Sequence, residues 1–248
     1  MSTSTPRIVA LVQARMGSSR LPGKVLKDLA GATALSRVLA RLRRAETIHE
    51  VVVATSTAAG DDAVVAECAR LGAKVFRGDE QDVLDRYYRA AQQAGADIAV
   101  RITADCPLID PGITDKTVRA FLAERPDYAS NALDRTYPRG LDTEVMTMTA
   151  LERAWKEATE PYQRAHVTPY LYQVPGRFRV LSVTGNHDYG ALRWTLDTEP
   201  DLDFLRAVYG RFSGRDDFTW TDVVRMLESA PEISAINRAI RQKALHEG

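Results

Sequence analysis

The feature that most constrains the fold is an alternation between short apolar runs and segments of helical periodicity along residues 8–102. Near-continuous apolar runs are typical of strands buried on both faces of a parallel sheet. Strands that alternate with helices of ordinary length indicate βαβ units with right-handed crossovers. The sequence therefore predicts a doubly wound, mostly parallel α/β sheet. Its predicted strands are 8–14, 51–54, 74–76 and 98–102, and its predicted helices are 35–42, 61–71 and 82–94.

The pattern changes between residues 126 and 190, where prolines punctuate short strands and one or two helices. We interpret this segment as an excursion from the sheet, within one domain over residues 1–248. The alternation then resumes, and Thr221 with Asp222 is the expected N-cap of a helical tail. The elements predicted here are strands at 144–147 and 178–183 in the excursion, a strand at 192–196, a helix at 199–209 and the tail over about 215–248.

The composition excludes several classes of protein. Thirty-three Lys and Arg balance thirty-three Asp and Glu, so no nonspecific attraction to nucleic acid or anionic lipid is expected. Residues 1–6 lack the apolar core of a secretory signal, and no run approaches the roughly 18 apolar residues of a membrane span. We therefore expect a cytoplasmic protein. Cys68 and Cys106 are isolated and predict reduced thiols, not a disulfide or zinc site.

The loop after the first predicted strand, residues 15–24, has two glycines, three cations and no acid. Glycines let the backbone approach a ligand, and the cations Arg15, Arg20 and Lys24 suit a polyphosphate. The loop is not a Walker A motif, because five residues rather than four separate Gly17 from Gly23. A solvated turn is the alternative interpretation.

Two carboxylates follow predicted strands that are distant in sequence. Asp105 ends the strand at 98–102, and Asp197 ends the strand at 192–196. Ligands of open α/β sheets bind at the carboxyl ends of the strands, so both side chains could share Mg2+ with substrate phosphates. Taken singly, each is equally suited to cap a helix. Asp110 and Asp201 are better explained as helix caps.

Five segments together resemble a known family: VQARMGSSRLPGKV, VVVATS, FRGDEQDVLDRYY, RITADCPLIDP and RWTLDTEPDL. They are similar to the cytidylyltransferase family of CMP-sugar-acid synthetases, with the best match in its SpsF-like branch of spore-coat polysaccharide biosynthesis. The similarity covers about residues 8–209 in the family's order. It implies a Rossmann-like fold of the nucleotide-diphospho-sugar transferase type.

The resemblance also implies roles for the loop residues. Arg15 and Lys24 would hold the triphosphate of CTP, and Asp105 and Asp197 would carry Mg2+. For Asp82, capping of the following helix is an equally good interpretation. The nucleotide contacts that the resemblance implies are Ala14, Gly17, Ser18, Ser19, Arg20, Asp82 and Arg86.

The excursion would supply the contacts to a small anionic acceptor, and Arg139 or Arg164 could pair bidentately with its carboxylate. For His166, packing or a dimer contact is the better interpretation. Related synthetases form twofold dimers, so we expect a homodimer through the helix around residues 164–172; the alternative is that the aromatic residues there pack inside their own subunit. The candidate acceptor residues are Asn131, Arg139, Asp142, Glu144, Arg164 and His166.

The implied reaction is in-line attack of an acceptor oxygen on the α-phosphorus of CTP, with release of pyrophosphate. Positioning and charge neutralisation would supply the catalysis, and no side-chain base is assigned. A nucleotide-sugar-dependent glycosyltransferase is the first rival, but it should show an Asp-x-Asp motif where Asp105 is followed by Cys106 and Pro107. A non-catalytic nucleotide-binding protein is the second.

Overall fold

A seven-stranded sheet with the order β3-β2-β1-β4-β6-β5-β7 forms the centre of the molecule. In this computed structural model, which describes residues 5–242, β6 is antiparallel to both of its neighbours and the other pairings are parallel. The predicted doubly wound, mostly parallel sheet is therefore confirmed. The strands are β1 (Ile8–Gln13), β2 (Glu50–Ser56), β3 (Lys74–Gly78), β4 (Ile98–Thr103), β5 (Tyr128–Ser130), β6 (Glu144–Thr147) and β7 (Val180–Ser182).

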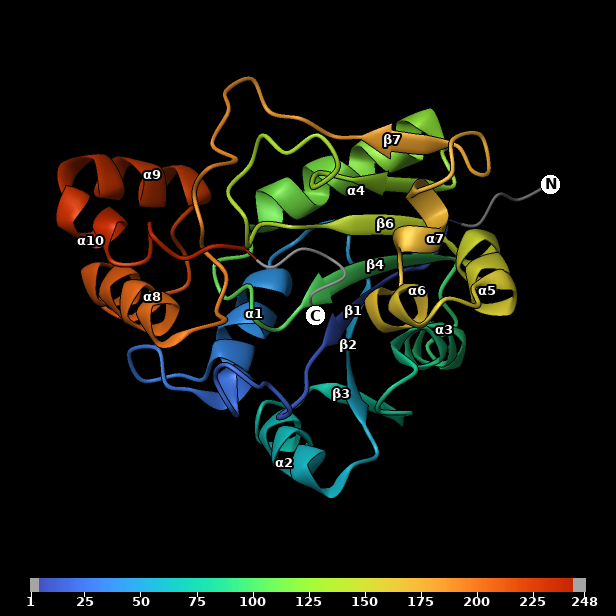
Figure 1. Cartoon of the computed structure of the whole chain (residues 1–248), viewed down its shortest axis with the longest axis horizontal. Coiled ribbons are helices and arrows are strands. Elements are labelled where there is room, and N and C mark those ends of the chain that lie inside the picture. Colours follow the sequence, from blue (N-terminus) through green and yellow to red (C-terminus); the bar gives the residue numbers. More distant parts are fainter. Residues whose placement is uncertain (1–4, 243–248) are drawn as a thin grey trace.

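Helices cover both faces of the sheet because successive strand residues point to opposite sides. Ala10 and Val12 of β1 pack with α1, α2 and α4, whereas Val9 and Leu11 pack with α3, α5 and α7. The helices α8, α9 and α10 form a separate group beside the sheet (Figure 1), and their buried residues share a hydrophobic cluster with Trp194. The helices are α1 (Ala34–Leu42), α2 (Asp62–Arg70), α3 (Val83–Gln93), α4 (Pro111–Glu124), α5 (Met148–Glu157), α6 (Pro161–His166), α7 (Pro169–Tyr172), α8 (Glu199–Arg211), α9 (Trp220–Ser229) and α10 (Pro231–Ala235).

Residues 126–190, expected as an excursion, extend the sheet instead of leaving it. They contribute β5, β6 and β7, and the antiparallel pairing of β6 with β4 joins them to the parallel strands. Proline-rich connections and strands of only three or four residues weaken the sequence signal for a sheet. The segment also carries α5, α6 and α7.

Two predicted boundaries were wrong. Residues 192–196 form no strand, because their backbone hydrogen bonds go to loops. Arg139 and Arg193 form an isolated β-bridge, and the Leu196 N–H donates to the Asp105 carbonyl. The N-cap of α9 is Thr219, not Thr221 with Asp222. The Thr219 side chain accepts from the Asp222 N–H, and the Asp222 carboxylate accepts from the Thr219 N–H, which makes a capping box.

The structure also bears on the predicted thiols, membrane spans and Asp110 cap. Cys68 and Cys106 are both buried free thiols, as the sequence predicted. Among residues 5–242, every helix is too short or too polar to span a bilayer. Asp110 caps α4 by accepting the Ile113 N–H, so that prediction is also confirmed.

Candidate active site

The two predicted metal carboxylates meet at the amino group of Lys24. Lys24 Nζ lies 2.7 Å from Asp105 Oδ2 and 2.8 Å from Asp197 Oδ1. Asp105 follows β4, Asp197 immediately precedes the cap of α8, and Lys24 begins a short 3-10 helix after the first loop. Gly23 makes the turn into that helix with a φ of 66°, a left-handed conformation that favours glycine. Segments far apart in sequence thus converge on one cation.

The electrostatics of this cluster keep Lys24 and Asp105 charged. Burial would lower the pKa of Lys24, but Asp105 and Asp197 outweigh it and raise that pKa to about 12. Burial would raise the pKa of Asp105, but Lys24 together with hydrogen bonds from Thr103 and Cys106 lowers it to about 2. Burial and the Asp105 charge hold the pKa of the Cys106 thiol well above its usual value, which opposes formation of the thiolate.

A second layer of polar residues holds Asp197. Arg193 Nη2 donates to Asp197 Oδ2 at 2.9 Å and to Asp201 Oδ2 at 2.9 Å. Asp201 is fully buried and also completes the capping box of α8 with Thr198, which confirms its predicted role at the helix start. Asn237, from the chain after α10, donates to the Arg193 carbonyl and to Asp201 Oδ1. The C-terminal region therefore fixes Asp197 through two intermediates.

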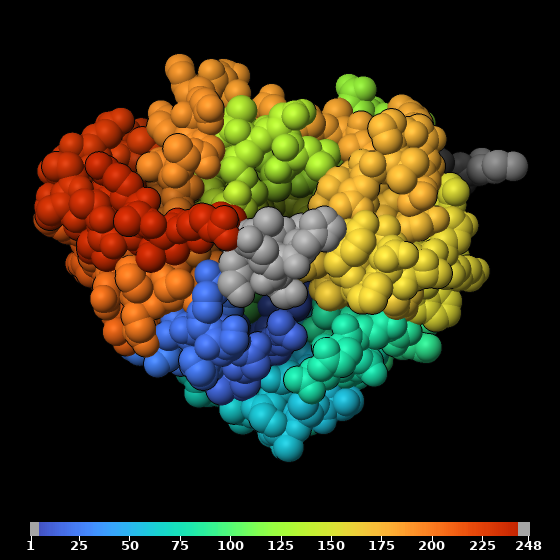
Figure 2. Space-filling view, in the orientation of Figure 1, coloured from blue at the N-terminus to red at the C-terminus, as the bar shows by residue number. Residues whose placement is uncertain are grey.

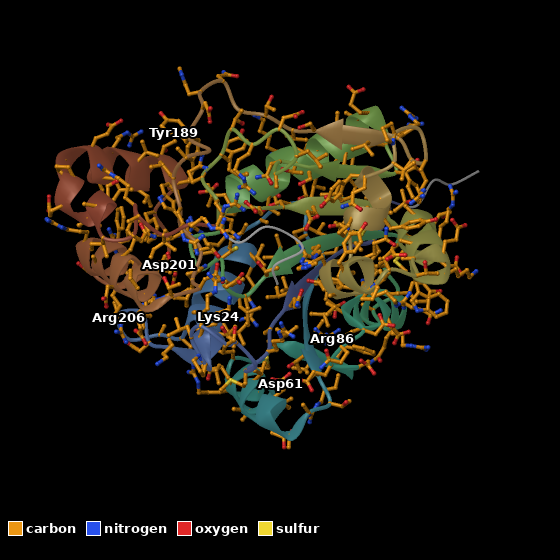
Figure 3. The ribbon with its side chains drawn as sticks, viewed as in Figure 1. Lys24, Asp61, Arg86, Tyr189, Asp201 and Arg206 are labelled. Carbon is orange, nitrogen blue, oxygen red and sulfur yellow. The ribbon has the colours of Figure 1, made fainter. Side chains whose placement is uncertain are left out.

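The first loop lies open beside this cluster. Arg15 and Arg20 are exposed, and Arg20 reaches Asp197 at 3.4 Å. In Figure 2 the face of the molecule is hollowed between the blue N-terminal residues and the teal residues, and Figure 3 labels Lys24 and Arg86 on segments that border this hollow. Ala14, Gly17, Ser18 and Ser19, the other predicted contacts of the loop, lie on the same segment, Ala14 being buried and Gly17 and Ser19 exposed.

The two predicted nucleoside contacts differ in their surroundings. Asp82 caps α3 by accepting the Asp85 N–H and also forms an ion pair with Arg164. Its alternative interpretation as a cap is thus confirmed. Arg86 is fully buried and donates to the Asp79 carbonyl, but its Nε and Nη2 atoms have no hydrogen-bond partner among the described residues. Arg86 therefore has N–H donors free to bind a ligand, whereas the Asp82 carboxylate is already bonded within the chain.

Most of the predicted acceptor residues already bind one another or the backbone. Asn131 is buried and bonded to the Leu141 carbonyl and the Thr143 N–H, and Asp142 is paired with Arg135 through both oxygens. Glu144 accepts from Arg101, Tyr128 and Thr168, and Arg164 donates to Asp82 and two carbonyls. These four side chains brace the fold.

Arg139 differs from the other acceptor candidates, because no side-chain hydrogen bond or ion pair joins it to any described residue. Burial lowers its pKa, and neighbouring Arg135 lowers it further. Cys106 and Asp142 lie close enough to act on the same pKa, so Arg139 borders the Asp105 region. His166, the last residue of α6, is partly exposed. A half-buried, unpaired guanidinium is thus the feature best suited to an anion.

Sequence reasoning missed Asp61, Arg193 and Asn237. Asp61 stands at the start of a helix, where a carboxylate is expected to be a cap, and Arg193 acts on the site through its bonds to Asp197 and Asp201. Asn237 reaches Arg193 and Asp201 from 44 and 36 residues away. Residue type and spacing do not reveal these contacts, because they depend on how the chain folds back on itself.

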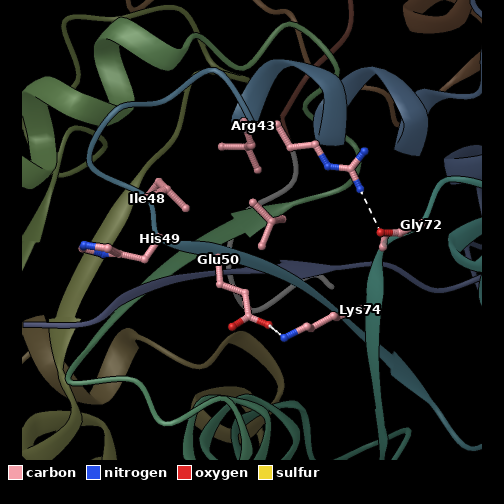
Figure 4. A pocket seen from close by; sticks show the side chains of 9 residues that line it. Arg43, Ile48, His49, Glu50, Gly72 and Lys74 are labelled. Atoms are coloured by element: carbon pink, nitrogen blue, oxygen red, sulfur yellow. Dashed lines mark hydrogen bonds and ion pairs between the residues drawn. The ribbon is translucent and has the colours of Figure 1, made fainter.

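A groove of about 420 Å3 at the other end of the strands is separate from this cluster. It opens at the amino ends of β2 and β3, where Glu50 pairs with Lys74 and Arg43 donates to the Gly72 carbonyl (Figure 4). Since these charged groups have partners within the chain, the groove presents no unpaired charge of the kind that Arg139 offers.

Comparison with known proteins agrees with this geometry. A model of the cytidylyltransferase family matches residues 9–210. The spore coat polysaccharide biosynthesis protein SpsF of Bacillus subtilis is 31% identical over 94% of this chain and 98% of its own length. A cytidylyltransferase structure from Leptospira borgpetersenii is 33% identical with a TM-score of 0.90, covering 97% of this chain and 100% of that chain.

A more distant structure shares the fold. CMP:2-keto-3-deoxy-manno-octonic acid synthetase complexed with CTP superposes with a TM-score of 0.63 at 20% identity, covering 83% of this chain and 99% of that chain. These matches confirm the predicted family and its SpsF-like similarity. The chain is a nucleotidyltransferase and belongs to the cytidylyltransferase family.

Proposed function

We propose that this protein transfers CMP from CTP to a small anionic acceptor and releases pyrophosphate. The observation that carries the proposal is the position of Lys24 between Asp105 and Asp197, beside the exposed cations Arg15 and Arg20. Phosphoryl and nucleotidyl transfer depend mainly on positioning and charge neutralisation, which this arrangement can provide. The CTP of the related synthetase complex supports the choice of nucleotide.

Magnesium is the cofactor that we propose. Among the described residues there is no cluster of three or more His, Cys, Asp or Glu side chains for a metal, but Mg2+ commonly takes only one or two carboxylates and shares the rest of its coordination with phosphates. Asp105 and Asp197 offer two carboxylates that face one cation, which fits this ligand set. When bound there, Mg2+ would neutralise charge on the phosphates and act as a Lewis acid.

The chain's own residues would divide the remaining work. Arg15 and Lys24 would bind the triphosphate, Arg15 as a planar fork and Lys24 as a point charge. The buried Arg86 donors support a contact with the nucleoside. Arg193, held by Asp201, would keep the Asp197 carboxylate oriented while the acceptor oxygen attacks the α-phosphorus.

We propose a sugar acid or a related polysaccharide precursor as the acceptor. Arg139 supports this choice, because it is half-buried and unpaired while Arg164 is already bound to Asp82. The names of two relatives, one in spore coat polysaccharide biosynthesis and one a synthetase for a keto-deoxy sugar acid, point to the same substrate class. Arg139 would then bind the carboxylate of the acceptor bidentately.

We also propose a cytoplasmic homodimer. Of the aromatic residues in the segment 126–190 that suggested the dimer, Tyr128 and Tyr170 belong to the core of their own subunit, and Tyr172 and Phe178 pack against it. These four residues therefore no longer support the dimer. Support comes instead from β7, the outer strand of the sheet, where Val180 is 42% exposed. An apolar outer strand is commonly covered by a partner. Light scattering would test this: an active particle of 27.5 kDa would exclude the dimer.

The test of the proposed function is an assay of pyrophosphate release. The protein is incubated with each of the four nucleoside triphosphates, Mg2+ and a panel of sugar acids, neutral sugars and phosphonates. We expect release that requires CTP, Mg2+ and an anionic acceptor. Transfer from a nucleotide sugar with no use of CTP would overturn the proposal in favour of a glycosyltransferase.

A further inference from the structure

Asp61 occupies the N-cap position of α2, but its carboxylate makes no capping hydrogen bond. It is 3% exposed and faces the loop that follows β1. Asp61 Oδ1 accepts the Met16 N–H at 2.7 Å, and Oδ2 accepts Thr55 Oγ1 at 3.0 Å. The Ser56 N–H and hydroxyl also donate to Oδ2, at 3.0 and 2.5 Å. One carboxylate thus ties the first loop to the end of β2.

The charge of Asp61 matters as well as its hydrogen bonds. Burial would raise the pKa of Asp61, but hydrogen bonds from Met16, Ser56 and Thr55 outweigh it and lower that pKa. The group therefore stays ionised. Arg86, whose pKa is lowered by burial, is close enough to respond to the charges of both Arg15 and Asp61. In Figure 3, Asp61 and Arg86 lie on neighbouring segments.

We propose that Asp61 is a positioning residue for the nucleotide. By holding the N–H of Met16, it fixes the backbone next to Arg15, so that the Arg15 side chain is directed toward the triphosphate before CTP arrives. Preorganisation of this kind strengthens binding because less conformational freedom is lost. The inference rests on the proposed function of the loop as the triphosphate site.

Asp115 provides a matched control for the structural part of this role. It is 4% exposed, lies in α4 and accepts the N–H groups of Glu46 and Thr47 at 3.0 and 2.9 Å, and the Thr47 hydroxyl at 2.6 Å. Like Asp61, it is a buried carboxylate that anchors a loop. Its loop precedes the amino end of β2, whereas the ligand edge lies at the carboxyl ends.

The experiment compares Asp61→Asn with Asp115→Asn in the full chain. Calorimetry measures the Kd of CTP with Mg2+, steady-state assays measure KM and kcat, and hydrogen exchange follows the Met16 amide. We expect Asp61→Asn to raise Kd and KM for CTP by about tenfold, as loss of one charge-assisted hydrogen bond would. We expect a much smaller change in kcat and faster exchange at Met16. Asp115→Asn should leave Kd and KM unchanged.

A second variant covers the case in which Asp61→Asn folds poorly. Ser56→Ala keeps the carboxylate but removes one of its donors, so KM for CTP should rise by a smaller factor, about threefold. Unchanged CTP affinity in both Asp61→Asn and Ser56→Ala, with normal binding by the wild type, would overturn the positioning role and leave the proposed function standing. A wild-type protein that does not bind CTP would overturn the proposed function and this inference with it.

Discussion

The two halves of the ligand edge treat their polar residues differently. On the side of β1 to β3, Arg15 is exposed and the buried Arg86 has donors without partners among the described residues. On the side of β5 and β6, Asn131, Asp142 and Glu144 are already bonded within the chain. The first half presents groups that a ligand can satisfy. The second half is mostly self-satisfied, and Arg139 is its exception.

This difference shows that membership of a motif does not by itself make a residue a ligand contact. A polar residue in a motif either meets a ligand or holds the chain that meets it, and burial with complete hydrogen bonding marks the second kind. Glu144 and Asp105 illustrate the two kinds. Glu144 accepts from three donors of its own chain. Asp105 is paired with Lys24, and a metal ion can compete with Lys24 for Asp105 as a phosphate can compete with Asp105 for Lys24.

The largest expected effect is the loss of a carboxylate that faces Lys24. We expect Asp105→Asn and Asp197→Asn each to lower kcat by on the order of 10³-fold, since charge stabilisation at the reacting phosphate is removed. Pyrophosphate release from CTP measures this, with Asp203→Asn, an exposed residue of α8, as the control. Wild-type rates in Asp197→Asn would exclude it from the metal site.

The second effect tests the self-satisfied half. Burial would lower the pKa of Arg101, but Glu144 outweighs it and raises that pKa, so the two charges depend on each other. We expect Glu144→Gln to lower the free energy of unfolding by about 3 kcal/mol, because a buried guanidinium loses its partner. Urea denaturation measures this, with Glu228→Gln, an exposed residue of α9, as the control.

The activity of Glu144→Gln decides between the two roles. At a temperature where the variant is folded, we expect kcat and KM for CTP close to those of the wild type. A normal free energy of unfolding together with a large rise in the acceptor KM would mean that Glu144 contacts the acceptor, as the sequence motif suggested.

The sequence could predict the parallel half of the fold because its signals are local. Apolar runs and helical periodicity each lie within a few residues, and they predict the observed β1 to β4. The cationic glycine loop after β1 is an equally local signal. The strand expected at 192–196 failed for a physical reason: Trp194 and Leu196 are buried as in a strand, but their partners are loops. Burial pattern alone does not distinguish the two.

The site was predictable to a similar extent. Lys24 and Asp105 could be brought together because the segments after β1 and β4 share an edge of the sheet. The sequence places Asp197 there through a strand at 192–196 that does not form, but Asp197 reaches Lys24 from the segment before α8. The residues that hold them could not be predicted. Asn237 reaches Arg193 from 44 residues away, and Asp61 stands at a position where a helix cap is expected. The catalytic roles of these residues stay predictions until the assays above are made.

The next effect concerns Arg139 and Arg164, the two cations that the sequence could not separate. We expect Arg139→Ala to raise the acceptor KM by about tenfold and leave the KM for CTP unchanged, since a charge-assisted pair is lost. Arg164→Ala should lower stability, because Asp82 and two carbonyls lose their donor, without a specific effect on the acceptor. The reverse pattern would place the acceptor anion beside α6.

Lys24 distinguishes the triphosphate from the rest of the nucleotide. We expect Lys24→Ala to weaken CTP binding about tenfold more than CMP binding, because the point charge acts on the β- and γ-phosphates that CMP lacks. Calorimetry measures both affinities, and Lys27→Ala, three residues further along the chain, is the control. Equal losses for CTP and CMP would show that Lys24 does not hold the polyphosphate tail.

The smallest effect tests a corrected boundary far from the ligand edge. Thr219 accepts the Asp222 N–H and closes a capping box, whereas the Thr221 hydroxyl contacts only Thr219 among the described hydrogen bonds. We expect Thr219→Ala to lower the free energy of unfolding by about 1 kcal/mol and Thr221→Ala by less than half as much. Thermal and urea unfolding of both variants measure the difference, and neither should change KM for CTP. A larger loss in Thr221→Ala would restore the cap that the sequence suggested. A change in KM would show that the start of α9, like Asp201 of α8, is coupled to the nucleotide site.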